Sequence, residues 1–414
     1  MQPNAAPPDR PRDDVRAVSP QSRRGLDWFV FFVADIQTGF GPFVAVFLTS
    51  QKWTQVDIGL VLTASGLVGL IGQLPFGAVV DAARSVRAVA ALSLVAIGSS
   101  AFAFAAWPIF PVVLAARLLH AAASCILGLG VASISLGLVG ADQMSERLGR
   151  NAAFASAGTG IAAAIMGATG YYLSNSAVFF LAGALALPAI YALFRIKREE
   201  IGPASDADRG MPTTAGSLAA SFAGFARNRP FLIFMVCVVL FHLANAAMLP
   251  LAASMMTLKS SKAATLMVAA AIVVPQFTVT LLSPWVGLWA QKIGRKPILL
   301  AGFGALAVRG FLFAVTGDPL LLTFIQALDG VSAAALGVLV PLTAVDVTRR
   351  HGHFNLAQGA IGCAMGIGAA ASTTLAGYVS DNLGSHAAFT MLAALAAFGF
   401  AVLAIAMPET KPRR

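Results

Sequence analysis

The stretch GAVVDAARSVR, at residues 77–87, lies between two long apolar runs of the sequence. A second stretch, GLWAQKIGRKP at residues 287–297, also follows a long apolar run and also combines glycine with basic residues. Each is polar, and each connects segments that are long enough to cross a bilayer as helices. The two stretches therefore predict short basic loops between membrane-spanning helices, one in each half of the chain.

The composition is typical of a membrane protein. The chain has 414 residues, of which 58% are hydrophobic and only 11% are charged, and its mean hydropathy is +0.79. A soluble domain has about 25% charged residues. The net charge of +10 could indicate nucleic-acid binding, but the basic residues are scattered between apolar spans. A cytoplasmic excess of Lys and Arg explains them, so we expect a lipid bilayer and no nucleic acid as partner.

Twelve apolar segments reach the length of about 20 residues that a membrane-spanning helix needs. The expected spans are residues 26–49, 55–80, 88–106, 109–140, 150–174, 177–195, 230–256, 263–290, 297–316, 319–347, 354–380 and 386–407. Cys125, Cys237 and Cys363 all fall inside these spans, and no CxxC pair or disulfide framework is present.

The positive-inside rule predicts that both termini are cytoplasmic. In that orientation Lys52, Lys259 and Lys262 are the only basic residues outside, and Arg117 and Arg309 are inside the membrane. The expected domains are a cytoplasmic tail (1–25), an N-terminal six-helix bundle (26–195), a cytoplasmic linker (196–229), a C-terminal six-helix bundle (230–407) and a second tail (408–414).

The linker has a flexible middle rich in Pro, Gly and Asp, followed by apolar residues at helical spacing. Leu218, Phe222 and Phe225 suit a short helix on the membrane surface. The alternative is an unstructured linker.

The two halves resemble each other, which indicates an internal duplication. Residues 114–128 align with 323–337, and residues 36–42 align with 244–250. Residues 149–158 align with 353–362. The alignment places Arg117 opposite Gln326, His120 opposite Asp329, Gln37 opposite Asn245 and Asn151 opposite Asn355. Duplicated six-helix halves are a transporter architecture with the site near the bilayer midplane.

The two basic loops resemble the signature loop of the major facilitator superfamily: a glycine, an acid four residues on, and a basic cluster. The matching residues are Gly77, Asp81, Arg84 and Arg87 in the first loop, and Gly287, Gly294, Arg295 and Lys296 in the second. Gln291 replaces the acid of the second loop, and the first loop lacks the second glycine. Glu146 and Arg150, between helices 4 and 5, resemble the ExxxR pair of that family.

This resemblance implies an all-α membrane protein with twelve transmembrane helices in two pseudo-symmetric six-helix bundles. It also implies that helices 1, 4, 7 and 10 line a cavity and that helices 3, 6, 9 and 12 are peripheral. We expect Asp81 to bond the N-terminus of a helix from the other half and the loop arginines to bridge carboxylates across the halves, latching the cytoplasmic side. The alternative is that the arginines only fix topology.

Arg309 lies in the middle of the apolar run ALAVRGFLFAV, where an isolated charge is costly and a partner is expected. Counted from the turn at residues 317–319, Arg309 is about 10 Å and Asp329 about 15 Å deep. We therefore expect a buried ion pair between them. The alternative is that Arg309 contacts substrate directly.

Further polar residues are expected near the bilayer centre, where they would carry substrate and protons. Asp35 is the only acid that we place inside the N-terminal half, and it would be the proton carrier. The expected set is Asp35, Gln37, Arg117, His120, His242, Asn245, Gln276, Gln326 and Asp329. The alternative is that the amides only bond between helices and that the histidines are satisfied core residues.

Motifs of soluble enzymes and of ATP binding (HExxH, GxSxG and the P-loop) do not occur in the sequence. We expect no enzyme and no cofactor, and a monomeric secondary transporter in the bacterial inner membrane that exports a small organic solute with proton coupling. Exporters of the superfamily that the chain resembles often have a glycine-rich helix 5 with a Gly-Pro step; Gly158, Gly167 and Gly170 resemble its glycines, and the Gly-Pro step is missing. The alternatives are import of an organic anion and a non-transporting receptor.

A third alternative is a transporter of a soft metal. It would use His242, Met248, Met255, Met256 and Cys237. Their spacing does not place them on one helix face with His242, so we expect no metal site.

Overall fold

The computed structural model describes residues 18–39, 44, 47–48, 51–53, 55–202, 215–259, 264–348 and 353–411. Within these ranges the regular elements are α-helices, apart from the short 3-10 turn η1 (Arg198–Glu200). The prediction of an all-α membrane protein is therefore confirmed.

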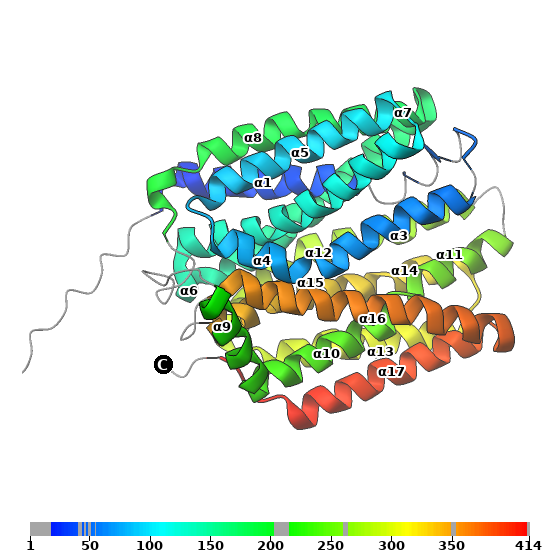
Figure 1. Ribbon diagram of the computed structural model, residues 1–414. Coiled ribbons are helices and arrows are strands. Elements are labelled where there is room, and N and C mark those ends of the chain that lie inside the picture. The colour runs from blue at the N-terminus through cyan, green and yellow to red at the C-terminus, as the bar shows by residue number, and fades with distance from the viewer. Residues whose placement is uncertain are drawn as a thin grey trace, which may run out of the picture.

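The N-terminal half contributes the helices of the upper part of Figure 1. They are α1 (Pro20–Gly39), α3 (Gln55–Ile71), α4 (Gln73–Asp81), α5 (Val86–Ala106), α6 (Phe110–Tyr172), α7 (Asn175–Ala184) and α8 (Ala186–Arg195). Helices α3 and α4 together form the second predicted span, which is bent by 49°. Pro75 lies in the first turn of α4 and has no N–H to continue the hydrogen bonding of α3, which explains the break.

Helix α6 contains both the fourth and the fifth predicted spans. They are separated by a single residue, Gly140, whose φ of 70° and ψ of 171° are accessible to glycine. Helix 5 therefore starts directly after Gly140, and the expected start at residue 150 is wrong. Glu146 and Arg150 consequently lie on a helix and not in a loop.

The C-terminal half forms the lower part of Figure 1. Its helices are α9 (Ala215–Arg227), α10 (Arg229–Asn245), α11 (Met248–Lys259), α12 (Ala264–Lys292), α13 (Lys296–Val315), α14 (Pro319–Ile325), α15 (Ala327–Thr348), α16 (Phe354–Leu383) and α17 (Ser385–Ala406). The helix expected around Phe225 is α9. The Phe225 side chain is buried against Phe231 of α10, with ring centroids 5.5 Å apart, while the side chains of Leu218 and Phe222 lie outside the described ones.

The helices account for the twelve predicted spans. In the described part of the chain nine helices are long and apolar enough to cross a membrane, or ten when the bent pair α3–α4 is counted as one. One of these, α6, holds two spans, and the first span runs from α1 into residues outside the described ranges.

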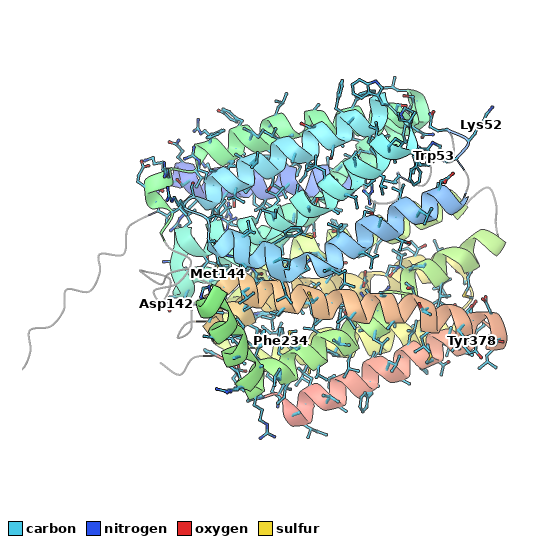
Figure 2. The ribbon with its side chains drawn as sticks, viewed as in Figure 1. Lys52, Trp53, Asp142, Met144, Phe234 and Tyr378 are labelled. Carbon is cyan, nitrogen blue, oxygen red and sulfur yellow. The ribbon has the colours of Figure 1, made fainter. Side chains whose placement is uncertain are left out.

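The two halves meet most closely at one end of the bundle. This end carries α9 and the C-terminus in Figure 1 and Asp142 in Figure 2, and we call it the basic end. Lys52, Trp53 and Tyr378 lie at the opposite end. Helix α16 packs extensively against α4, which reaches the basic end, and much less against α3, which leads to the opposite end.

Glycines allow this close contact between the halves. A Cβ atom on Gly77 of α4 would lie 2.4 Å from the Asn355 carbonyl oxygen of α16. A Cβ atom on Gly149 of α6 would lie 2.3 Å from the Ser283 carbonyl oxygen of α12. Any larger residue at either position would push the halves apart at the basic end.

Candidate functional site

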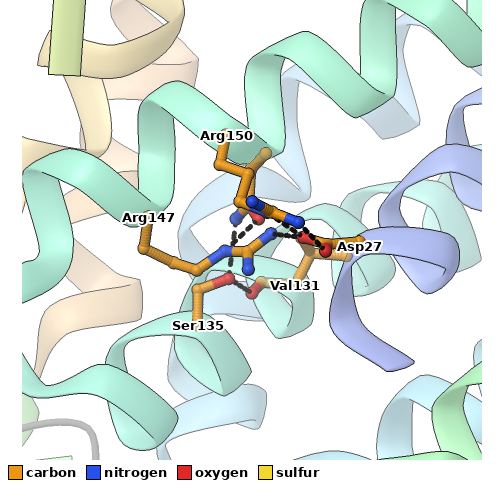
Figure 3. A network of polar contacts seen from close by, with 6 residues as sticks. Asp27, Val131, Ser135, Arg147 and Arg150 are labelled. Carbon is orange, nitrogen blue, oxygen red and sulfur yellow. Dashed lines mark hydrogen bonds and ion pairs between the residues drawn. The ribbon is translucent and has the colours of Figure 1, made fainter. Parts of the chain in front are cut away.

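The basic end of the N-terminal half is organised around Asp27, a residue of α1 that is only 2% exposed. Its carboxylate accepts hydrogen bonds from two arginines of α6 (Figure 3). Arg147 Nη2 lies 2.6 Å from Oδ1. Arg150 binds both carboxylate oxygens, with Nε 2.8 Å from Oδ1 and Nη2 2.6 Å from Oδ2. Such bidentate pairs are the strong form of the arginine–carboxylate contact.

A chain of hydrogen bonds extends this cluster to the neighbouring turn of helix 4. Arg147 Nε donates to Asn151 Oδ1 at 2.7 Å, and Asn151 Nδ2 donates to Ser135 Oγ at 2.8 Å. Ser135 in turn donates to the Val131 carbonyl oxygen at 2.7 Å, as Figure 3 shows. The network ties helices 1, 4 and 5 together on both sides of the Gly140 break.

Arg150 forms its ion pair with Asp27, and Glu146 is exposed. One expectation about the acids of this half is wrong: Asp35 is not its only buried acid, because Asp27 is equally inaccessible. The physical reason is that Asp27 lies where the apolar span begins, and a carboxylate buried there requires cationic partners.

The first signature loop binds the other half of the protein through Asp81. Its Oδ1 accepts from the Asn355 backbone N–H at 3.2 Å and from Asn355 Nδ2 at 2.7 Å, and its Oδ2 accepts from the Leu356 N–H at 3.0 Å. Asn355 Nδ2 also donates to Ser133 Oγ at 3.4 Å. The carboxylate therefore caps the N-terminus of α16, where N–H groups lack helical partners and the helix dipole favours a negative charge.

The second signature loop binds differently. Gln291 Nε2 donates to the Asp142 carbonyl oxygen at 3.2 Å, which is a single neutral bond to the other half. Arg295 binds Asp346 of its own half, with Nε 3.0 Å from Oδ2. The Glu409 carboxylate accepts from the backbone N–H groups of Arg295 and Lys296, at 2.8 Å and 3.1 Å. The C-terminal segment thus caps α13.

The described contacts of the loop arginines lie within their own halves. Arg87 stacks on Phe194 at 4.8 Å and donates to the Phe194 carbonyl oxygen at 3.4 Å. Arg84 is exposed at the rim of a cavity of about 320 Å³ that Asp81 and Asn355 also line. The bridging of carboxylates across the halves by these arginines stays a prediction.

Arg309 and Asp329 lie together, as an ion pair between Nη1 and Oδ1. The same Nη1 donates to Asn245 Oδ1 at 2.7 Å, and the guanidinium lies 5.4 Å from the centre of the Phe313 ring. The side chain of Arg309 is 1% exposed and that of Asp329 is 23% exposed. Asn245, expected as a substrate contact, is therefore part of this cluster between α10, α13 and α15.

Asp35 stands apart from these clusters. It is 4% exposed, and its Oδ1 has no hydrogen-bond partner in the described part of the chain. It faces helix 5, where a Cβ atom on Gly158 would lie 2.7 Å from this oxygen. Asp35 is therefore a buried carboxyl group held between helices 1 and 5 without an ion-pair partner in the described residues.

Arg117 and His120 lie one turn apart on helix 4. Arg117 Nη2 donates to Ser65 Oγ of α3 at 3.3 Å. His120 is buried, its Nε2 lies 3.2 Å from Ser124 Oγ, and it is close enough to Arg117 to experience its charge. Arg117 places a positive charge beside helix 2 in the central part of the bundle, one turn from the buried imidazole of His120.

The remaining expected residues make few contacts. His242 is partly buried, and its Nε2 has no hydrogen-bond partner among the described residues. Gln326 is fully buried, and both polar atoms of its side chain lack partners there. Gln37 and Gln276 are partly exposed. Among the described residues, no cluster of three or more His, Cys, Asp or Glu side chains could hold a metal ion.

A comparison with protein families identifies this architecture. The model of the Major Facilitator Superfamily matches residues 28–279 and 235–414. The chain belongs to the major facilitator superfamily. An MFS-type transporter of Mycobacterium tuberculosis is 37% identical over 403 residues, which cover 96% of this chain and 95% of that protein.

Solved structures of other superfamily transporters share the fold. The fucose:proton symporter FucP of E. coli has a TM-score of 0.72 at 16% identity and covers 93% of this chain and 98% of its own. The human organic anion transporter MFSD10 (TETRAN) has a TM-score of 0.68 at 18% identity, with 93% and 100% covered. At these identities the likeness concerns the fold alone.

Sequence reasoning missed several charged residues of this superfamily transporter. They are Asp27, Arg147, Asp346 and Glu409. Asp27 carried a usable signal, because an acid at the second position of an apolar span is costly unless it is paired. Asp346 and Glu409 lie at the ends of their spans, where a charged residue is expected in any membrane protein, so the sequence contains no comparable signal for them.

Proposed function

We propose that this superfamily transporter is a proton-coupled secondary transporter that exports a small organic solute by alternating access. The observation that supports proton coupling best is Asp35. It is buried at the packed contact of helices 1 and 5, and one of its oxygens has no partner in the described residues. Asp27 and Asp329, by contrast, are bound to arginines.

The absence of a salt bridge matters for a proton carrier. A carboxylate held by arginine stays ionised, whereas a carboxyl group in a low-dielectric site without a counter-ion can exist in both protonation states. Asp35 can therefore gain and lose a proton without breaking an ion pair. Its contact with Gly158 couples a change in hydration or charge to the packing of helix 5.

The packing of the halves supports alternating access. We assign the basic end to the cytoplasm because its loops carry most Lys and Arg residues. Asp81 caps α16 across the halves at this end, and Gly77 allows the close backbone contact. These contacts support a state in which the cytoplasmic side is closed.

The substrate class is proposed from Arg117 and His120. Arg117 donates to the neutral hydroxyl group of Ser65. The partly buried His242 lies on α10 of the other half. A site with these groups favours an organic anion. This proposal agrees with the name of MFSD10 as an organic anion transporter, whereas the name of FucP as a proton symporter supports proton-coupled import as the second direction to be tested.

The test uses purified protein in liposomes with an imposed pH gradient. The probes are a labelled dicarboxylate, a labelled monosaccharide and a lipophilic cation, with internal pH recorded by a dye. We expect dicarboxylate movement to be coupled to opposite proton movement, to be abolished in Asp35→Asn, and to persist in Asp318→Asn. Asp318 is an exposed N-cap of α14, a position at which Asn caps equally well.

Accumulation of the probe against its gradient by Asp35→Asn at the wild-type rate would contradict the coupling role. Proton movement in the same direction as the probe would show symport in place of the proposed exchange of solute for protons, and would favour import. Transport of the cation or the sugar, without the dicarboxylate, would contradict the anion assignment.

A further inference from the structure

Two cysteine side chains from different halves meet at the break in helix 2. Cys125 lies on α6 of the N-terminal half, and Cys363 lies on α16 of the C-terminal half. The break lies between Ile71 and Gln73, where α3 and α4 are bent by 49°. Neither thiol is used in the clusters described above, and both side chains are partly exposed.

The hydrogen bonds of the two thiols place them on adjacent residues of helix 2. Cys125 Sγ donates to the Gly69 carbonyl oxygen at 3.7 Å and accepts from Gln73 Nε2 at 3.5 Å. Cys363 Sγ donates to the Leu70 carbonyl oxygen at 3.3 Å.

One of these contacts replaces a bond of a straight helix. The Leu70 carbonyl oxygen would accept from the Leu74 N–H in a continuous helix, and here it accepts from the Cys363 thiol. The two thiols therefore bond to consecutive carbonyl groups, those of Gly69 and Leu70, beside the break in helix 2.

The contact forms across the interface that must separate during alternating access. Gln73 packs against α16 without spare room, since a Cβ atom on Gly359 would lie 2.3 Å from the Gln73 carbonyl oxygen and one on Gly362 would lie 2.6 Å from Gln73 Oε1. Cys237 provides an internal comparison, because it is 1% exposed within the C-terminal half. Only Cys125 and Cys363 can be joined across the halves.

The chemistry of the two thiol groups determines which class of metal ion they can bind. Two thiols without a third His, Cys, Asp or Glu in the described surroundings do not make a tetrahedral zinc site, but thiolates select soft metals. A divalent cation held by two thiolates is a neutral unit, which the low-dielectric interior of a membrane protein tolerates better than a charged one. Metal–sulfur bonds of about 2.3 Å require sulfur atoms roughly 4.6 Å apart, and the two thiols bond to the carbonyl groups of consecutive residues, Gly69 and Leu70.

We propose that Cys125 and Cys363 form a two-thiolate site for a soft divalent cation, with Hg²⁺ as the probe, and that the bound cation holds the basic end closed. Each thiol releases its proton to water, and one metal–sulfur bond forms to each half. The second part of this proposal rests on the proposed alternating access, while the binding itself does not.

The test uses the purified full-length protein with one equivalent of Hg²⁺, followed by excess glutathione, and native mass spectrometry to count retained metal. Joining two thiols in one site raises the effective affinity by about 10²-fold or more over a single thiol. We expect the wild type and Cys237→Ser to retain one Hg²⁺, and Cys125→Ser and Cys363→Ser to lose it. Serine keeps a hydroxyl donor for the same carbonyl groups, and an unchanged melting temperature confirms the fold.

Retention of the metal by either single variant, or its loss from the wild type, would overturn the site. Closure is tested separately by hydrogen exchange of the Asn355 and Leu356 amides, which bond to Asp81. We expect exchange there to slow at least tenfold with Hg²⁺ in the wild type and to stay unchanged in Cys363→Ser. Bound metal with unchanged exchange would overturn the closure and leave the proposed transport function untouched.

Discussion

Neutralising Asp329 should destabilise the protein more than neutralising Arg309. Asp329→Leu leaves a guanidinium that is 1% exposed and keeps its hydrogen bond to Asn245 and its contact with the Phe313 ring, both of which are neutral. Removing one partner of such a pair costs about 3–5 kcal/mol. Arg309→Leu leaves a carboxylate that is 23% exposed and still hydrated on one side, so its cost is nearer the roughly 1–3 kcal/mol of an unsatisfied buried acceptor.

The measurement is thermal unfolding of the two single variants and the double variant in the same detergent. For a two-state transition of a chain of this size, 3–5 kcal/mol corresponds to a fall in Tm of about 3–6 °C. The double variant Arg309→Leu/Asp329→Leu should recover most of the loss, because replacing both charges by apolar groups is close to neutral. The control is Arg84→Leu, an exposed arginine outside the cluster.

Losses that add in the double variant would show that the two residues do not interact. Equal losses in the single variants would refute the argument from unequal exposure. Transport by the double variant separates the two roles of Asp329. A stable and active double variant shows a structural pair, whereas a stable and inactive one shows that Asp329 contacts substrate or proton.

Three further predictions concern the basic end. Asp27→Asn should lower stability by about 3–5 kcal/mol, because buried Arg147 loses its counter-ion, while Glu146→Gln should stay within about 0.5 kcal/mol; both are measured by thermal unfolding. Asp81→Asn should speed hydrogen exchange of the α16 amides by roughly 10- to 100-fold, since charge-assisted hydrogen bonds contribute about 1.5–3 kcal/mol each. Gln291→Ala should change this exchange less than tenfold. Equal effects of the two variants would contradict the argument that Asp81 holds the halves together more strongly than Gln291 does. Gly77→Val should leave the protein folded but make the same amides exchange faster, because no space exists for its Cβ atom.

The fold could be predicted because the hydropathy of the sequence indicates which segments lie in the bilayer. Twelve apolar segments and a duplicated basic loop are enough to infer two six-helix halves. The Gly140 break shows the limit of this signal. Residues 141–149 are polar enough to read as a loop, but hydropathy measures solvent and not backbone conformation, so a helix that extends beyond the membrane is indistinguishable from a loop.

The partners of polar residues could be predicted only where a charged residue lies so deep in the membrane that it must pair with an acid at the same depth. Arg309 lies deep in an apolar span, so it needs a partner, and Asp329 is the acid at matching depth. Arg150 lies at a span end, where it could bind Glu146, Asp27 or water, and helix packing decides between them. Cys125 and Cys363 carry no charge and follow no sequence pattern, and their bonds to the Gly69 and Leu70 carbonyl groups depend on the local geometry of the break in helix 2.

Helix 2 connects the centre of the molecule with its closed end. Its first part, α3, carries Ser65, which binds Arg117 in the central region. Its second part, α4, ends at Asp81, which caps α16 of the other half. If the substrate binds Arg117 as proposed, it competes with Ser65 of α3 for that arginine. The bend between α3 and α4 would then let α3 move while α4 stays bound to α16 through Asp81, so that substrate binding and opening of the basic end would be separate steps.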